Sequence, residues 1–170
     1  MTTSPLATRP SAAADPPPLP AIHGWNVLHG TGTFELDVPD QAEMSRRRDD
    51  VLGKGLPWLV AERDGVVLGY AYANHFRPRR AYRFCLEDSI YLADAARGQG
   101  VGTLLLAELV SRCEAAGARQ MLAVIGDSAN DAEAARAAGI PVLLVTDGYS
   151  EGRPVDSIEC DGLLSSLVDA

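Results

Sequence analysis

Short apolar runs separated by turn residues occupy the middle of the chain. Strands are expected over Pro57–Glu62 and Val66–Ala73, because both runs are rich in β-branched, aliphatic and aromatic residues. The turn signal Arg63-Asp64-Gly65 between them predicts a hairpin. Pro78 then interrupts the pattern, and Tyr82–Leu92 is expected to form a third strand. Together these runs predict an antiparallel meander.

Helical spacing appears on both sides of this meander. Apolar residues three to four positions apart predict a helix over Val101–Ala116 with one face toward a core. Gln41–Gly53 is expected to form another helix, with Asp40 as its N-cap. Ala21–His29 is a short amphipathic stretch, which Gly24 is expected to break.

The last third of the chain predicts a strand, a helix and a strand. These cover Gln120–Ile125, Ala129–Ala138 and Pro141–Thr146, and Ser157–Leu167 is expected to be a weak helix or a tail. The order of elements predicts an α/β fold (an α+β mixed sheet) in one domain over residues 21–170. Residues 1–20, rich in Ala, Pro, Ser and Thr, are expected to be a flexible tail, because they bury too little apolar surface to offset their ordering entropy.

Composition and charge argue against some classes of partner. The 170 residues are 46% hydrophobic and 22% charged, which is typical of a globular protein. The net charge of −8 argues against a nucleic-acid partner, because phosphate binding needs clustered Lys and Arg. Residues 1–120 carry 13 basic and 14 acidic side chains, whereas residues 121–170 carry 2 and 9. No apolar run approaches the ~18 residues of a membrane span, so no membrane partner is expected. Three dispersed cysteines without a CxxC pair indicate reduced thiols and a cytoplasmic location.

The turn before the Val101 helix is a candidate ligand site. Its glycines, at alternate positions in Arg97-Gly98-Gln99-Gly100-Val101-Gly102, let a ligand approach the backbone closely because no Cβ intervenes. The N–H groups of a first helical turn have no intrahelical partner, and the helix dipole adds positive potential there. The segment therefore predicts a phosphate-binding loop. A GxGxxG motif is excluded by Thr103, and a P-loop is excluded because Lys54 is the only lysine.

This loop and its flanks resemble a known family. The spacing Arg97-x-x-Gly100-x-Gly102 resembles the pyrophosphate loop of the GNAT superfamily of acyl-CoA-dependent N-acetyltransferases. Residues 21–130 resemble its phosphinothricin N-acetyltransferase-like branch at His29–Glu35, Leu56–Trp58, Leu68–Ala73, Phe76–Arg79, Ala81–Arg83, Glu87–Tyr91, Arg97–Gly102 and Ala123–Gly126. The resemblance implies the GNAT fold, acetyl-CoA as co-substrate and acetyl transfer to the primary amine of a small amino-acid-like acceptor. Phosphinothricin and methionine sulfone are acceptors of this kind, and the implied assembly is a homodimer.

The resemblance also implies roles for single residues. Glu87 would be the general base, directly or through water. A backbone N–H near Leu92 would polarise the thioester carbonyl. The implied cofactor-binding residues are Ile90, Tyr91, Leu92, Arg97, Gly98, Gln99, Gly100, Val101, Gly102, Thr103 and Asn130. The implied acceptor-binding residues are Phe34, Glu35, Arg79 and Tyr82, with an arginine suited to a substrate carboxylate.

From about residue 126 the chain departs from that branch. Gly126–Asp131 with Ala134–Ala138 instead resembles the fourth motif of the haloacid dehalogenase superfamily, closest to its phosphoglycolate phosphatases. In those enzymes Asp127 and Asp131 would help to hold Mg²⁺. Here they are expected to cap a helix, and no metal site is expected.

Three functions remain open on the sequence. An active N-acetyltransferase is favoured, and a non-catalytic or impaired acyl-CoA-binding hybrid is the alternative, because the closing strands and the Leu-His pair expected to hold the general acid are replaced. Tyr149 is the remaining candidate for that acid. A Mg²⁺-dependent phosphatase is least favoured, because no DxD nucleophile motif exists and Glu62 stands at its nearest match.

Overall fold

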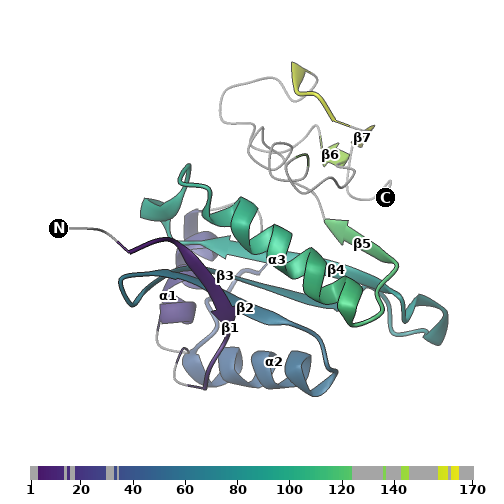
Figure 1. The fold of residues 1–170 in the computed structure, drawn as a ribbon, viewed down its shortest axis with the longest axis horizontal. Helices are drawn as coiled ribbons and strands as arrows, with labels where there is room; N and C mark the ends of the chain where they lie inside the picture. Colours follow the sequence, from purple (N-terminus) through teal and green to yellow (C-terminus); the bar gives the residue numbers. More distant parts are fainter. Residues whose placement is uncertain are drawn as a thin grey trace.

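The computed structural model describes residues 4–13, 15, 18–29, 33, 35–123, 136, 143–145, 157–160 and 162–164. Its main feature is a mixed sheet of five strands in the order β1-β2-β3-β4-β5 (Figure 1). The strands are β1 (Ala7–Pro10), β2 (Trp58–Arg63), β3 (Val66–His75), β4 (Cys85–Leu92) and β5 (Gln120–Ala123). The first four pair antiparallel, and β5 pairs parallel to β4. The predicted meander and mixed sheet are confirmed.

The hairpin between β2 and β3 has the predicted turn. Asp64 and Gly65 both have positive φ, 52° and 76°, which matches the twist of the flanking strands. The third strand begins later than predicted, at Cys85, because Arg80–Tyr82 form a short 3₁₀ turn, η1. A second 3₁₀ turn, η2 (Asp94–Ala96), joins β4 to the glycine-rich loop.

Within the described ranges, three helices cover the two faces of the sheet (Figure 1). Helix α3 (Val101–Ala115) lies on one face, and α1 (Pro18–His29) and α2 (Gln41–Gly53) lie on the other. Asp40 caps α2 as predicted, because its Oδ1 accepts a hydrogen bond of 2.8 Å from the Glu43 N–H. The prediction that Gly24 breaks the preceding stretch is wrong, since α1 continues through it.

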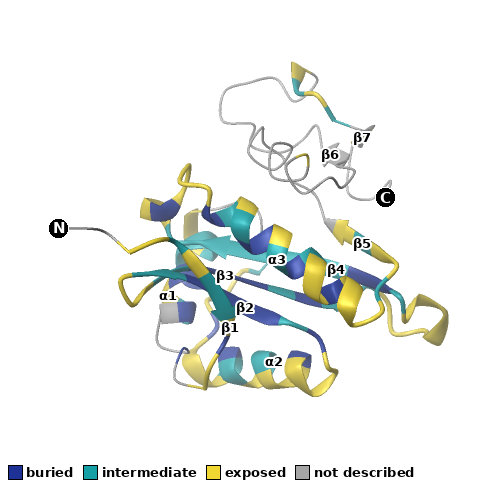
Figure 2. Cartoon of the chain, viewed as in Figure 1, coloured by how far each residue is buried: buried dark blue, intermediate teal, exposed yellow. Residues whose placement is uncertain are grey.

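Apolar packing fixes α3 on the sheet. Leu105 and Leu109 are fully buried there, and Figure 2 shows the helix buried on its sheet side and exposed on the other. Gly69 of β3 lies beneath this contact, where a Cβ would come within 2.5 Å of the Leu92 side chain and 3.4 Å of Leu105. A Cβ would also lie 2.9 Å from the Tyr91 carbonyl oxygen of β4, so the packing of β4 against β3 at this point favours glycine.

The N-terminal segment corrects the sequence prediction. Residues 7–10, predicted to lie in a flexible tail, form the edge strand β1. Polar contacts compensate for the scarcity of apolar side chains: Arg9 binds Asp15 at 2.8 Å and Glu62 at 2.8 Å, and the Ser11 N–H donates to the Trp58 carbonyl. The composition of this segment did not predict an ordered strand, because the strand is stabilised by pairing with β2, which is distant in the sequence.

The described C-terminal residues form a separate parallel pair, β6 (Leu143–Val145) and β7 (Gly162–Leu164). β6 lies within the strand predicted at Pro141–Thr146. The prediction of a weak helix or tail over Ser157–Leu167 is wrong at β7, where parallel pairing with β6 decides the conformation. The helix predicted over Ala129–Ala138 lies outside the described residues except for Arg136. No helix in the described ranges is long and apolar enough to cross a membrane.

Candidate active site

The glycine-rich loop presents a row of unengaged backbone donors. Gly98 and Gly100 have φ of 69° and 77°, and an added Cβ at either would meet nothing within 4 Å. The first backbone bond of α3 runs from the Leu104 N–H to the Gly100 carbonyl. Within the described chain, the six N–H groups from Gly98 to Thr103 therefore have no hydrogen-bond partner. The positive end of the helix dipole lies at the same place, so the arrangement suits a phosphate group.

Beyond Asp88, no described residue pairs with the edge of β4 that faces away from β3. Pairing between β4 and β5 ends at Asp88 and Ala123, the last described residue of that segment. The Ala93 N–H donates to the Leu68 carbonyl at 2.9 Å, which fixes the alternation of hydrogen bonds along β4. By that alternation, Ile90 and Leu92 direct their N–H and carbonyl groups away from β3, whereas Tyr91 directs its N–H and carbonyl toward Tyr70 of β3.

The side chains of the loop are anchored to their surroundings. Gln99 donates to the Ala95 carbonyl at 2.6 Å and accepts from Arg63 at 3.0 Å. The Arg97 guanidinium lies 4.5 Å from the centroid of the Trp25 ring and donates to Asn26 Oδ1 at 3.1 Å. None of these side-chain contacts engages a backbone N–H of the loop.

Glu87 lies on the opposite face of the sheet from α3. It lies opposite Asn74 of the neighbouring strand β3, and it is partly buried. Burial raises the pKa of Glu87, and the positive charge of Arg77 opposes that rise. A carboxylate with a raised pKa is a better proton acceptor, so the position is suited to general base chemistry.

A buried polar network lies on this same face. His23, only 1% exposed, contacts the Tyr70 hydroxyl through Nδ1 at 2.7 Å and Glu35 Oε1 through Nε2 at 3.1 Å. Arg47 binds both oxygens of Glu35, at 2.7 and 3.0 Å. Burial lowers the pKa of His23 against the opposing effect of Glu35. The histidine is therefore a neutral ring that donates to Glu35 and accepts from Tyr70.

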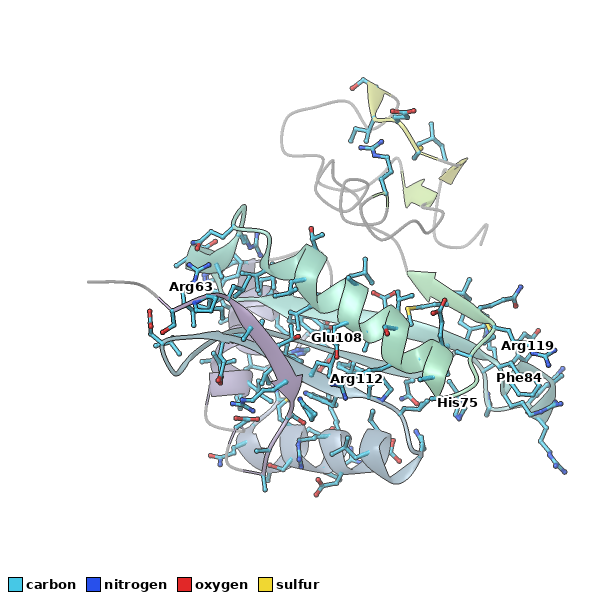
Figure 3. All side chains as sticks on the ribbon, in the orientation of Figure 1. Arg63, His75, Phe84, Glu108, Arg112 and Arg119 are labelled. Atoms are coloured by element: carbon cyan, nitrogen blue, oxygen red, sulfur yellow. The ribbon has the colours of Figure 1, made fainter. Side chains whose placement is uncertain are left out.

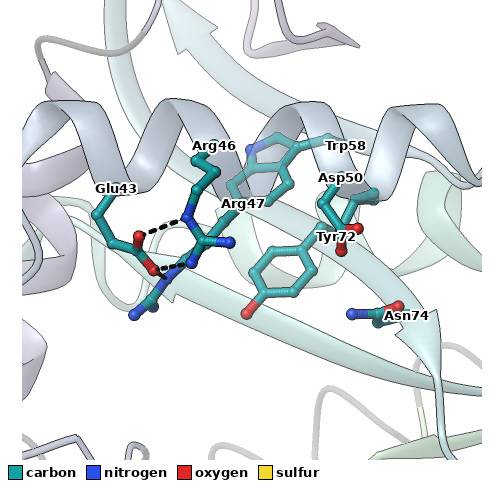
Figure 4. Close-up of a pocket in the computed structure, with 8 residues that line it drawn as sticks. Glu43, Arg46, Arg47, Asp50, Trp58, Tyr72 and Asn74 are labelled. Carbon is teal, nitrogen blue, oxygen red and sulfur yellow. Dashed lines mark hydrogen bonds and ion pairs between the residues drawn. The ribbon is translucent and has the colours of Figure 1, made fainter. Parts of the chain in front are cut away.

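A polar cavity of ≈ 190 Å³ opens between α2 and the sheet (Figure 4). Along α2, Glu43 binds Arg46 at 2.8 Å and Arg47 at 2.7 Å, and these arginines lower the pKa of Glu43 to about 2. The cavity borders the Glu87 region through Asn74. Its lining residues are Glu43, Arg46, Arg47, Asp50, Val51, Trp58, Tyr72 and Asn74.

The β3–β4 connection is rich in exposed arginines. Phe84 has the guanidinium groups of Arg83 and Arg119 at 4.2 and 4.7 Å from its ring centroid. Figure 3 labels Phe84, Arg119 and His75 at this end of the sheet, far from Arg63 near the glycine-rich loop. Arg77, Arg79, Arg80, Arg83 and Arg119 form no ion pair with another described residue.

The predicted site residues fall into two groups. The predicted cofactor-binding residues Ile90, Tyr91, Leu92 and Arg97–Thr103 lie together at the end of β4 and in the glycine-rich loop. Glu87, Glu35, Arg79 and Tyr82 belong to the α1/α2 face and the arginine-rich turn. Phe34, Asn130 and Tyr149 lie outside the described residues. Tyr91 stacks on Tyr70 at 5.2 Å, so its side chain faces α1 rather than the loop.

Several residues of the site escaped sequence reasoning. Asn26, Arg47 and Asn74 carry no motif, and only the fold brings them to the site. The sequence offered one indication of a polar face on the sheet. Tyr70 and Tyr72 are two residues apart, and residues two apart on a strand share a face.

Comparisons with known proteins agree with this geometry. The family described as "Acetyltransferase (GNAT) family" matches residues 25–138. A phosphinothricin N-acetyltransferase of Alcaligenes faecalis is 49% identical over 148 residues, which are 85% of this chain and 75% of that protein. An L-methionine sulfoximine/L-methionine sulfone acetyltransferase of Pseudomonas aeruginosa is 36% identical over 118 residues, 69% of each chain.

A solved structure gives the same result. The crystal structure of a GNAT superfamily phosphinothricin acetyltransferase from Sinorhizobium meliloti in complex with AcCoA matches with a TM-score of 0.76 at 43% identity. The match covers 90% of this chain and 83% of that one. The predicted family, fold and co-substrate class are confirmed.

The second predicted resemblance is also confirmed. A phosphoglycolate phosphatase of Thiobacillus denitrificans is 49% identical over 63 residues of the C-terminal region, 36% of this chain and 28% of that protein. The described residues contain no group of three or more His, Cys, Asp or Glu side chains that could hold a metal ion. Asp127 and Asp131 lie outside them.

Proposed function

Because the chain belongs to the acetyltransferase (GNAT) family, we propose that it transfers acetyl from acetyl-CoA to the primary amine of a small amino acid, of the phosphinothricin or methionine sulfone type. The observation that carries this proposal is the row of N–H groups from Gly98 to Thr103, which are unengaged within the described chain and lie near the end of β4. A diphosphate and an extended amide chain need such donors next to each other.

The cofactor would lie along this edge. The N–H groups of the loop would hold the diphosphate of acetyl-CoA, with Arg97 adding positive charge. The Ile90 carbonyl and the Leu92 N–H, which both face away from β3, would pair with the pantetheine amides. Tyr91 would contribute packing rather than backbone pairing, since its backbone is directed to β3.

The position of Glu87 indicates where the thioester would lie. Leu92 is five residues from Glu87 on a strand, a separation of roughly 17 Å, whereas Ile90 is roughly 10 Å away. The N–H of Ile90 is therefore the better donor to the thioester carbonyl than one near Leu92. Glu87, directly or through water, would take a proton from the acceptor ammonium. The free amine would then attack the carbonyl carbon and expel the CoA thiolate.

The arginine-rich turn would attract the acceptor carboxylate. Arg77 is close enough to lower the pKa of Glu87, so a carboxylate near Arg77 and Arg79 would place its α-amine toward Glu87. The cavity beside Asn74 offers room for a polar acceptor side chain.

A thiol-release assay with acetyl-CoA tests the proposal. Methionine sulfone should be acetylated, whereas its decarboxylated analogue, 3-(methylsulfonyl)propylamine, should show a KM about tenfold higher, a ratio worth ~1.4 kcal/mol. Arg79→Gln should raise the KM for methionine sulfone and leave that of the analogue unchanged. Acetyl-CoA binding without any turnover would favour the non-catalytic hybrid, and Mg²⁺-dependent phosphate release from phosphoglycolate would favour the phosphatase. The homodimer and the cytoplasmic location stay predictions.

A further inference from the structure

We infer that Asn26 of α1 is a positioning residue for the cofactor site, because its side chain holds the end of β4 and the Arg97 guanidinium in one fixed arrangement. This inference rests on the proposed function. It concerns how two separate elements, a strand edge and a loop, come to fit one extended ligand.

The Asn26 amide contacts three different parts of the fold. Its Nδ2 donates to the Ile22 carbonyl of its own helix at 2.8 Å and to the Leu92 carbonyl of β4 at 3.2 Å. Its Oδ1 accepts from Arg97 Nη2 at 3.1 Å. Both donors and one acceptor site of the amide are therefore engaged, and the side chain is partly buried.

The contact with Leu92 fixes the last peptide of the strand. The Leu92 carbonyl accepts from Asn26, and the N–H of the same peptide, on Ala93, donates to the Leu68 carbonyl at 2.9 Å. With both ends bound, this peptide has a set orientation. It is also the peptide at which the chain leaves the strand edge and turns into the loop.

The contact with Arg97 fixes the other side. The guanidinium lies over Trp25, the residue before Asn26, with 4.5 Å between its carbon and the ring centroid. Among the described residues it forms one ion pair, with Asp94, where the Nε–Oδ1 distance is 3.8 Å. Two adjacent residues of α1 thus hold the first side chain of the loop by stacking and by a hydrogen bond.

Holding the two elements together should improve affinity more than rate. A ligand that spans both elements loses less free energy on binding when their separation is already set. Neither Asn26 nor Trp25 lies on β4 with Glu87. Loss of Asn26 should therefore raise the Kd and the KM for acetyl-CoA and leave kcat within about twofold.

A double-mutant cycle tests the inference, with acetyl-CoA affinity measured by calorimetry on the full chain. Asn26→Ala and Arg97→Ala should each weaken binding about tenfold, and the double variant should bind more tightly than the product of the two effects predicts. Arg112→Gln, which alters an exposed pair on the far side of α3, is the matched control and should bind as the unaltered chain does.

A second variant distinguishes loss of the Asn26 hydrogen bonds from misfolding of the chain. Asn26→Asp preserves the shape and the acceptor for Arg97 but removes both donors, so it should still weaken binding at least threefold. An Asn26→Asp chain with unaltered affinity, or effects in the cycle that simply multiply, would overturn the inference. Failure of the proposed function would look different, because then the unaltered chain would not bind acetyl-CoA.

Discussion

The two faces of the five-strand sheet differ in the side chains that they carry. The α3 face is an apolar contact in which Leu105, Leu109 and Cys113 are buried, and burial raises the pKa of the Cys113 thiol to about 12. The α1/α2 face carries His23, Glu35, Arg47 and Tyr70 in a connected network of hydrogen bonds. The first arrangement stabilises the fold, and the second is a polar network on the same face of the sheet as the candidate base Glu87.

This difference implies that the two faces of β4 have different roles. Alternate residues of this strand face opposite sides, so Glu87 and Tyr91 lie on the polar face while Leu92 packs toward Leu105. Substitutions on the polar face should change reaction rates, and substitutions on the α3 face should change stability.

The largest expected effect is that of Glu87→Gln. Loss of a general base should reduce kcat by about 10²–10⁴-fold. The unfolding free energy should not fall, because burial of the charged carboxylate is unfavourable and Gln removes that charge. Steady-state rates and urea unfolding of the same preparation check both statements. A variant with near-normal kcat would show that Glu87 is an ordinary strand carboxylate.

Leu109→Ala should show the reverse behaviour. Leu109 is fully buried between α3 and the sheet, and a Leu→Ala change in a core costs about 2–5 kcal/mol of unfolding free energy. The kcat of the fraction that remains folded should stay close to that of the unaltered chain. A large loss of kcat with little loss of stability would contradict the division between the faces.

The smallest effect concerns pH. Arg77→Gln removes the charge that opposes the raised pKa of Glu87, so this pKa should rise further. Because Glu87 must be ionised to accept a proton, the acidic limb of the kcat/KM profile should move to higher pH by a few tenths of a unit. Arg119→Gln, an equally exposed substitution in the same region, should leave the limb in place.

The stability linkage for Glu87 has a definite sign. Its pKa is raised in the folded chain, so the folded state binds the proton more tightly than the unfolded state. Stability should therefore fall as pH rises from the ordinary carboxyl range through the raised pKa. Arg77→Gln should extend this fall to higher pH, which urea titrations at several pH values would detect.

Local patterns in the sequence predicted much of the fold. The strand alternation, the N-cap at Asp40 and the glycines before Val101 all act over a few residues, and the structure contains each of them. Edge strand β1 was missed because Ala7–Pro10 has no apolar pattern and depends on ion pairs with Asp15 and Glu62.

The site was less accessible from the sequence than the fold. The loop could be found because its proposed function, phosphate binding, needs consecutive backbone donors, which the glycine spacing indicates. Asn26 and Arg47 act through contacts 66 and 12 residues away along the chain, to Leu92 and Glu35, and no local pattern reports such pairs. The pairing of Tyr91 with β3 follows from register, which only the assembled sheet defines.

The central claim is that the N–H groups at the start of α3 bind the diphosphate of the cofactor. At 18.0 kDa the chain is small enough for backbone amide signals to be followed individually while acetyl-CoA is added. The account predicts that the amides of Gly98–Thr103 shift most, with Ile90 and Leu92 beside them, and that ADP alone shifts the loop amides but not those of the strand. Saturable acetyl-CoA binding that leaves the loop amides unmoved would contradict it.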